Sequence, residues 1–258
     1  MYHLKKEEMS KIVHILDGWN ETILWSCLQG YAGAAWTDDI QNPQSAQIWV
    51  GDFIFYAGKP DIELVKNIPA DFSAQNALMI PRNEEWSGLI EQVYTTRAKR
   101  FMRYAIKKES DVFDRDKLSA YIERLPSEYK IAAIDENLYN RILSQEWSRD
   151  LCSQFPTYSA FEKNGMSFAV MHNDSIAGGA SSYSVYNKGI EIEIDTHKDH
   201  RRKGIALACA SKLILTCLDR GLYPSWDAAN MASVALAEKL GYHFDKEYPT
   251  YSISNFRK

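Results

Sequence analysis

Cysteine is scarce in this sequence and long apolar runs are missing, and both facts narrow the class of protein. The 258 residues include 4 cysteines, none of them in a Cys-x-x-Cys pair, too few and too scattered for a disulfide framework. Such usage favours a reducing compartment. No segment approaches the roughly 18 consecutive apolar residues of a membrane span, and the first residues lack the apolar core of a signal peptide. We therefore expect a cytoplasmic protein with no membrane partner.

An excess of positive charge is missing as well. The 30 Lys and Arg residues face 34 Asp and Glu residues, so the formal net charge is −4. Because nucleic-acid binding depends on neutralising phosphates, this balance argues against a general nucleic-acid partner. A local basic pocket is still compatible with it.

Several well-known motifs are also absent. The sequence has no G-x-x-x-x-G-K-[S/T], no G-x-G-x-x-G and no G-x-S-x-G, which argues against a nucleotide hydrolase, a dinucleotide-binding fold and a serine hydrolase. His197 and His200 are three residues apart, a spacing that also occurs in metal-binding pairs. No third ligand follows at a convincing spacing, so we expect no metal.

The chain otherwise has the composition of a globular protein, 45% hydrophobic and 25% charged. A boundary is indicated at Leu125-Pro126-Ser127, which follows a helical pattern and precedes a new strand. We therefore expect an α/β domain over residues 1–125 and a second domain over residues 126–258. Both halves contain strand–helix–strand pieces of similar size, so a distant duplication is one interpretation of the first half.

Hydrophobic periodicity and turn residues predict the elements of both halves. In the first half we expect helices over residues 1–40 with breaks at Gly30 and Gly33, followed by strands in 47–57 and 77–80, a helix over 84–99, a strand over 101–106 and a helix over 116–125. In the second half we expect strands over 129–134, 167–172, 176–186, 189–196 and 222–226, helices over 137–147, 204–220 and 231–240, and final strands within 242–253.

One stretch, Gly189 to Ala206, organises the second half. Its first part alternates isoleucine with acidic residues, as a half-buried strand does, and its second part is a basic loop with one glycine. An amphipathic helix follows from Ile205. A basic loop at a helix N-terminus combines positive charge with free backbone N–H groups, so this stretch predicts an anion site.

The loop also carries a family pattern. Arg201-Arg202-Lys203-Gly204-Ile205-Ala206 matches Q/R-x-x-G-x-G/A, the acetyl-coenzyme A signature of the GNAT N-acetyltransferase superfamily, which this chain resembles from about Tyr129 to Ile253. Downstream, Trp226 to Asn230 and Ser233 to Tyr242 are similar to the family's second block, an Asn loop and a helix ending in Leu-Gly-aromatic. With its extra N-terminal part, the chain looks most like the subgroup of zwittermicin A resistance proteins.

The resemblance implies a GNAT acyl-CoA N-acyltransferase fold with a mixed sheet, an additional N-terminal α/β domain, and acetyl-CoA as co-substrate. Backbone N–H groups of the basic loop would hold the pyrophosphate, the end of the preceding strand would pair with the pantetheine arm, and the Asn loop would contact that arm from the other side. The cofactor-binding residues implied are Ile194, Asp195, Thr196, Arg201, Arg202, Lys203, Gly204, Ile205, Ala206, Asn230 and Ser233.

The sequence indicates the catalytic residues less specifically than it indicates the cofactor-binding residues. A base must remove a proton from the acceptor, because only about one lysine-like amine in 2,500 is neutral at pH 7. Glu191, Glu193 and Asp195 share one face of the strand, and Glu191 and Glu193 are the candidate bases; a solvated acidic face explains the same alternation equally well. The family's usual acid, a tyrosine in the second block, is replaced by Ala237. Tyr251 or Tyr248 is the candidate substitute.

The sequence thus predicts transfer of an acetyl group from acetyl-CoA to a primary amine by direct attack, with the oxyanion held by a backbone N–H near Ile194 to Thr196. Two alternatives stay open: an acetyl-CoA-binding protein without catalysis, and a tandem GNAT that transfers aminoacyl groups from charged tRNA. An amino-sugar antibiotic, a peptide N-terminus and a polyamine all fit as acceptor, and a homodimer is compatible with the sequence.

Overall fold

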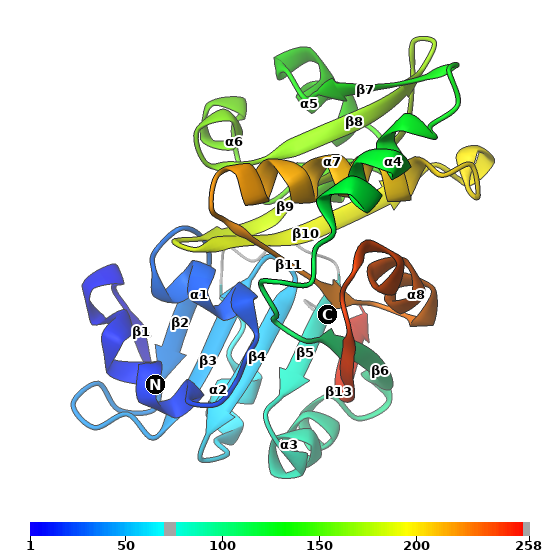
Figure 1. Ribbon diagram of the computed structural model, residues 1–258. Coiled ribbons are helices and arrows are strands. Elements are labelled where there is room, and N and C mark those ends of the chain that lie inside the picture. Colours follow the sequence, from blue (N-terminus) through cyan, green and yellow to red (C-terminus); the bar gives the residue numbers. More distant parts are fainter. Residues whose placement is uncertain (70–75, 255–258) are drawn as a thin grey trace. The chain divides into compact units, whose positions relative to one another are not determined.

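The computed structural model describes residues 1–69 and 76–254, and the chain forms two compact units (Figure 1). Unit 1 consists of Met1–Arg103 and Glu247–Lys258, and unit 2 of Tyr104–Lys246. This division differs from the one expected at residue 125 in two ways. Residues 104–125 belong to unit 2, where helix α4 (Arg115–Glu123) packs against helix α7 (Ile205–Asp219), and the last residues return to unit 1 by strand pairing.

Unit 1 begins with short elements. They are strand β1 (Tyr2–Leu4), 3₁₀ helix η1 (Lys6–Leu16), helix α1 (Thr22–Leu28), strands β2 (Ala34–Thr37), β3 (Ser45–Val50) and β4 (Phe53–Gly58), and helix α2 (Ile62–Lys66). Strand β5 (Asn76–Pro81), helix α3 (Glu84–Tyr94), 3₁₀ helix η2 (Thr95–Arg97) and strand β6 (Ala98–Ile106) follow. Strand β13 (Phe244–Ser254) ends the described chain.

The sheet of unit 1 has the order β1-β2-β3-β4-β5-β13-β6. Strands β1 to β4 are antiparallel neighbours, β4 pairs parallel with β5, and β5 pairs antiparallel with β13 through Tyr251↔Met79. Its core is strongly aromatic: Trp86, Tyr56 and Tyr94 are buried with Tyr251. Aromatic side chains bury large apolar areas, so a small unit gains a core from few residues.

Unit 2 contains most of the elements predicted for the second half. They are α4, strand β7 (Tyr129–Ala133), helix α5 (Glu136–Leu143), 3₁₀ helix η3 (Arg149–Leu151), helix α6 (Tyr158–Asn164), strands β8 (Ser167–His172), β9 (Ser175–Tyr186) and β10 (Gly189–Thr196), 3₁₀ helix η4 (Lys198–His200), α7, strands β11 (Tyr223–Ser225) and β12 (Asp227–Ala228), and helix α8 (Met231–Leu240).

The main sheet of unit 2 has the order β11-β10-β9-β8-β7. Strands β7 to β10 are antiparallel neighbours, and β10 pairs parallel with β11. Helix α7 packs on β8, β9, β10 and β11, as Figure 1 shows. Its inner face carries Cys209, Leu213 and Cys217, which are all fully buried, so the two cysteines act as small core residues.

The predicted α/β class is confirmed, and local signals explain most elements. Helix α5 starts where it was expected, because the Asp135 carboxylate caps it by accepting the N–H of Leu138 at 2.8 Å. The largest difference lies at the N-terminus. The 1–40 region is not one helical region: 3₁₀ geometry covers Lys6–Leu16, and the short strands β1 and β2 flank the helices.

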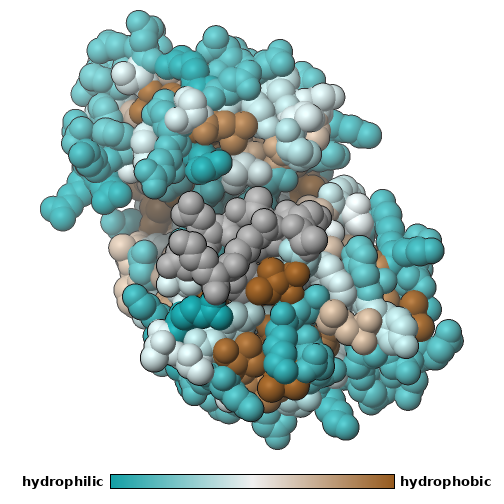
Figure 2. All heavy atoms as spheres, turned by 180° about the vertical axis from the view of Figure 1, so that it is seen from behind, coloured by the Kyte–Doolittle hydropathy of each residue, from teal (hydrophilic) through white to brown (hydrophobic). Residues whose placement is uncertain are grey.

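The surface is mainly polar. Figure 2 shows one face of the molecule, on which hydrophilic side chains dominate and apolar ones form small groups. The large hydrophobic side chains that are most exposed are scattered along the sequence, among them Met1, Tyr2, Tyr31 and Met231. Among residues 1–69 and 76–254, no helix is both long and apolar enough to span a bilayer.

Candidate active site

The end of strand β10 has an unpaired edge in unit 2. Strand β11 pairs only with Gly189–Glu191 and ends at Ser225, after which the chain pairs with β6 instead. The N–H of His197 donates to the Ala177 carbonyl of β9 at 2.9 Å. Because backbone groups alternate between the two edges of a strand, the N–H groups of Ile194 and Thr196 point away from β9. In the described part of the chain no strand covers that edge.

The loop after β10 leads into an open helix N-terminus. Gly204 is the N-cap of α7 with φ 80° and ψ −1°, a left-handed conformation that favours glycine, and it gives no side-chain cap to the helix. A Cβ added to Gly204 would meet nothing within 4 Å, so this backbone faces open space. The first N–H groups of a 15-residue helix are therefore accessible to an anion.

Positive charge surrounds that helix N-terminus. Arg201, Arg202 and Lys203 are all exposed, and Arg202 has φ 62°, which turns the chain toward Gly204. The Nε of Arg201 donates to the carbonyl of Thr196 at 3.4 Å and so ties the loop to the end of β10. The loop and the unpaired strand edge are thus adjacent parts of one site.

The two faces of β10 pack on different elements. A Cβ on Gly178, which is paired with Thr196, would touch Ile205 at the start of α7, whereas a Cβ on Gly179, which is paired with Asp195, would touch Leu151. Paired residues of an antiparallel sheet share a face. Thr196, Ile194 and Ile192 therefore face α7, and Asp195 and Glu193 face the opposite side of the sheet, where η3 lies. The pairing with β9 shifts register between Glu191 and Ile192, so this pattern does not extend to Glu191.

The acidic residues differ in their surroundings. Glu191 is buried, 7% exposed, and lies close to Tyr186, Tyr223 and Tyr242. Burial of these three phenols, together with the charge of Glu191, raises the pKa of each. Glu193 is half-buried, and its Oε1 accepts the N–H of Ile194 at 3.2 Å. A candidate base thus contacts a candidate oxyanion donor.

Asp195 has a perturbed acidity. Burial raises the pKa of Asp195 to about 6, the nearby Asp150 carboxylate of η3 adds to the rise, and Arg201 opposes it. The sequence predicts that the backbone of Asp195 pairs with the pantetheine arm. The structure adds that the carboxyl group of the same residue has a pKa of about 6.

The Asn loop has a structural role. Asn230 is the N-cap of α8, and its Oδ1 accepts the N–H of Ser233 at 3.0 Å. Ser233 in turn accepts the indole N–H of Trp226 at 3.1 Å. Ala237, at the position of the family's usual tyrosine, is fully buried in the core of unit 2.

Tyr251, the candidate acid, lies in unit 1. It is fully buried in strand β13, and its hydroxyl donates to Oε1 of Glu91 at 2.6 Å. Burial and the bond to Glu91 raise the pKa of this phenol.

Sequence reasoning missed a histidine cluster next to the basic loop. The rings of His172 and His197 lie 5.1 and 5.8 Å from that of His200, and the Tyr129 hydroxyl is 2.9 Å from Nδ1 of His200. Partial burial and the charge of Lys203 lower the pKa of His200. Among the described residues, no group of three or more His, Cys, Asp or Glu side chains could hold a metal ion. His172 lies on strand β8, far from His197 and His200 in sequence, so no local spacing of histidines predicted that it joins them.

The fold is that of acyltransferases of the GNAT type, and sequence comparison gives the family. A family model described as GNAT acetyltransferase matches residues 13–251, so the chain belongs to the GNAT acetyltransferase family and is a GNAT-family N-acetyltransferase. The match begins far before Tyr129, so the resemblance extends beyond the range from Tyr129 to Ile253 and includes most of unit 1. Acetyltransferases of this family generally use acetyl-CoA as co-substrate.

Individual relatives agree. An uncharacterised N-acetyltransferase, YdfB of Bacillus subtilis, is 24% identical over 268 residues, covering 97% of this chain and 98% of its own. The crystal structure of a GCN5-related N-acetyltransferase-like protein from Streptococcus suis is 44% identical, with a TM-score of 0.89 over 95% of this chain and 98% of that one. A tandem GNAT protein from the clavulanic acid pathway shares the fold at 9% identity, with a TM-score of 0.51 over 87% of this chain and 83% of that one.

Proposed function

We propose that this protein transfers the acetyl group of acetyl-CoA to a primary amine by direct attack, and that unit 2 carries the site. The observation that supports this most strongly is the continuity of the open N-terminus of α7 at Gly204 with the unpaired edge of β10. The helix N-terminus suits a pyrophosphate, and the strand edge suits an arm that carries amide groups.

The residues present fit acetyl-CoA. The Cβ direction of Gly204 is free, so the backbone can approach a phosphate closely, and the three cations before it raise the local potential of an acidic protein. The C=O group of Ile194 and the N–H and C=O groups of Thr196 would pair with the amides of the pantetheine arm. Acetyl-CoA supplies an activated thioester, so the protein needs to hold the carbonyl and remove a proton from the amine.

Glu193 and Ile194 would divide that work. The Ile194 N–H donates to Glu193 in the structure. In our proposal it donates to the thioester carbonyl during the reaction, which breaks its bond to the Glu193 carboxylate beside the reacting carbon. The released carboxylate accepts the proton of the attacking amine. Glu191 is the alternative base, and its buried charge would also attract a cationic acceptor.

The proton for the leaving thiolate is a separate question. Ala237 offers none. Tyr251, the candidate from the sequence, is buried in unit 1, where its hydroxyl donates to Glu91 and its pKa is raised, so we leave it out of the site proposed for unit 2. A coenzyme A thiolate is also a tolerable leaving group without an acid.

We further propose that unit 1 is a degenerate copy of the GNAT fold. Both units have four antiparallel strands followed by a parallel fifth strand. In unit 1 the helix between the last two strands, α2, has 5 residues, against 15 for α7 in unit 2.

We also propose that the chain is related to zwittermicin A resistance proteins, which the segment from Trp226 to Asn230 resembles. A cytoplasmic location is proposed as well, and the four buried free cysteines support it.

A direct experiment is to incubate the protein with acetyl-CoA and a panel of amines, namely an amino sugar, a peptide with a free N-terminus and a polyamine, and to follow thiol release. Turnover with one of them, together with a mass increase of one acetyl group on that amine, is the expected result. Tight acetyl-CoA binding without turnover on any amine would favour a binding protein. Transfer from an aminoacylated tRNA without use of acetyl-CoA would favour the tandem aminoacyl transferase.

A further inference from the structure

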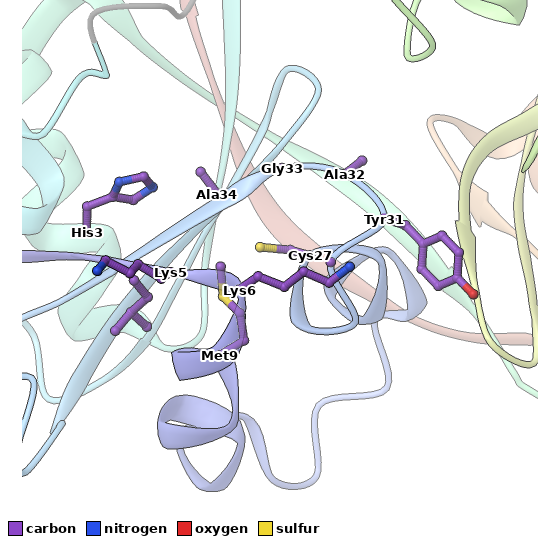
Figure 3. A pocket seen from close by; sticks show the side chains of 11 residues that line it. His3, Lys5, Lys6, Met9, Cys27, Tyr31, Ala32, Gly33 and Ala34 are labelled. Carbon is purple, nitrogen blue, oxygen red and sulfur yellow. The ribbon is translucent and has the colours of Figure 1, made fainter. Parts of the chain in front are cut away.

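Unit 1 has a pocket that the proposed acetyl transfer does not use. It has a volume of about 300 Å³ and is formed by residues 3–34, from β1 and the start of η1 to the end of α1 and the start of β2 (Figure 3). Its apolar side includes Leu4, Met9 and Cys27, which are buried. A volume of this size is at the lower end of the range for small-molecule sites.

The pocket is cationic. Lys5 and Lys6 line it together with His3, and none of the residues that line it is an Asp or a Glu. Glu8, the nearby acid, is already engaged, because its carboxylate accepts the backbone N–H of Lys5 at 3.0 Å and pairs with Lys11 at 3.5 Å. The two lysine charges of the pocket therefore contrast with a net charge of −4 for the whole chain.

Two glycines shape the wall of the pocket. Gly30 has φ 71°, and a Cβ there would lie 2.2 Å from Cε of Lys6, so the lysine stem lies directly over this glycine. In Figure 3 the Lys6 side chain extends beneath Cys27 toward the side where Tyr31 lies. Gly33 has φ 87°, and a Cβ there would lie 2.1 Å from the carbonyl oxygen of Trp49. Because glycine has no side chain, the backbone at Gly30 can lie against the Lys6 side chain, and the backbone at Gly33 can lie against that of Trp49.

We infer that this pocket binds a small organic anion with an apolar portion, of the aryl or alkyl carboxylate class. In Figure 3 the ammonium groups of Lys5 and Lys6 lie on opposite sides of the pocket, so Lys6, on the side of Tyr31, would pair with the carboxylate. The apolar portion would lie on Leu4, Met9 and Cys27. Tyr31, which is 45% exposed and lines the same pocket, would lie against the apolar portion of the bound anion. The assignment concerns unit 1 alone and goes beyond the proposed acetyl transfer.

The test is a titration of the full-length, ¹⁵N-labelled protein with 4-phenylbutyrate, followed by the backbone amide signals of residues 30–34. The neutral amide of the same compound is the ligand control, because it keeps the ring and the chain and removes the charge. We expect saturable shifts at these amides with the carboxylate and about tenfold weaker binding of the amide.

Matched variants test the role of the lysines. Lys5→Met and Lys6→Met keep the apolar stems and remove the charges, and the double variant should bind 4-phenylbutyrate about tenfold more weakly. Lys66→Met removes an exposed lysine of α2 outside the pocket and should leave the affinity unchanged. Equal binding of the carboxylate to the double variant, equal binding of the neutral amide, or an absence of saturable shifts at residues 30–34 would overturn the inference.

Discussion

The backbone N–H of Ile194 donates a hydrogen bond of 3.2 Å to the carboxylate of Glu193, its neighbour on the unpaired edge of β10. The N–H proposed to stabilise the oxyanion and the carboxylate proposed to act as base are therefore bonded to each other in the free protein. Acetyl-CoA would have to displace this bond, so cofactor binding and release of the base become one event. That coupling implies that acetyl-CoA binds before the amine reacts.

Glu193→Gln separates the two roles of this residue. The amide oxygen of glutamine still accepts the Ile194 N–H, but the side chain no longer removes a proton. We expect kcat to fall about 100-fold while the Kd for acetyl-CoA stays unchanged. The measurement is steady-state thiol release together with calorimetry. Glu191→Gln is the matched comparison, and a larger loss of kcat in that variant would assign the base to Glu191.

Asp195→Asn should change the pH dependence of stability. The pKa of Asp195 is about 6 in the folded protein, against an ordinary value of 3.8. Between these values the folded state holds one proton more than the unfolded state, so the contribution of Asp195 to the free energy of unfolding falls as pH rises through about 6.

The stability of the asparagine variant relative to the wild type should therefore rise by about 1–2 kcal/mol between pH 4.5 and pH 8, after allowance for partial exposure. Urea unfolding at both pH values is the measurement. Asp174→Asn, an exposed aspartate of the same unit, should show no such gain. A stability difference at pH 8 no larger than that at pH 4.5 would contradict the raised pKa.

Asn230 tests whether a helix cap also contacts the cofactor. Asn230→Ala removes the oxygen that accepts the Ser233 N–H and should lower the free energy of unfolding by about 1 kcal/mol. Asn230→Asp keeps the cap and should restore stability. If the residue also contacts the pantetheine arm, as proposed, both variants bind acetyl-CoA more weakly, and the aspartate variant does so while stably folded. Normal binding by the aspartate variant would leave Asn230 as a cap only.

The elements of unit 2 could be predicted because their signals are local. The alternation of isoleucine and acid marks β10, Gly204 marks the start of α7, and Asp135 marks the start of α5. The unpaired edge of β10 could be expected only through the family resemblance, since it depends on where β11 ends.

Other features have no local signal. Strand β13 returns to unit 1 and pairs Tyr251 with Met79, a partner far away in sequence. His172 joins His200 from another strand in the same way. The spacing of apolar residues in η1 indicated a helix, and the segment is a 3₁₀ helix rather than an α-helix. Periodicity therefore predicted where a helix lies but not its type.

The central claim is that the N-terminus of α7 holds acetyl-CoA, and a pair of glycine variants tests it most directly. Gly204 and Gly221 both have positive φ, 80° and 66°, and a Cβ at either would meet nothing within 4 Å. They flank opposite ends of the same helix, so Gly204→Glu and Gly221→Glu impose similar backbone strain and charge. Acetyl-CoA binding to each variant is measured by calorimetry, with thermal unfolding as the check on folding.

Gly204→Glu should weaken binding about 100-fold or more, because at least two hydrogen bonds to the pyrophosphate are lost and a negative charge is added. Gly221→Glu should bind acetyl-CoA as the wild type does. Normal binding by a folded Gly204→Glu variant, or equal losses in both variants, would contradict the assignment of this loop to acetyl-CoA.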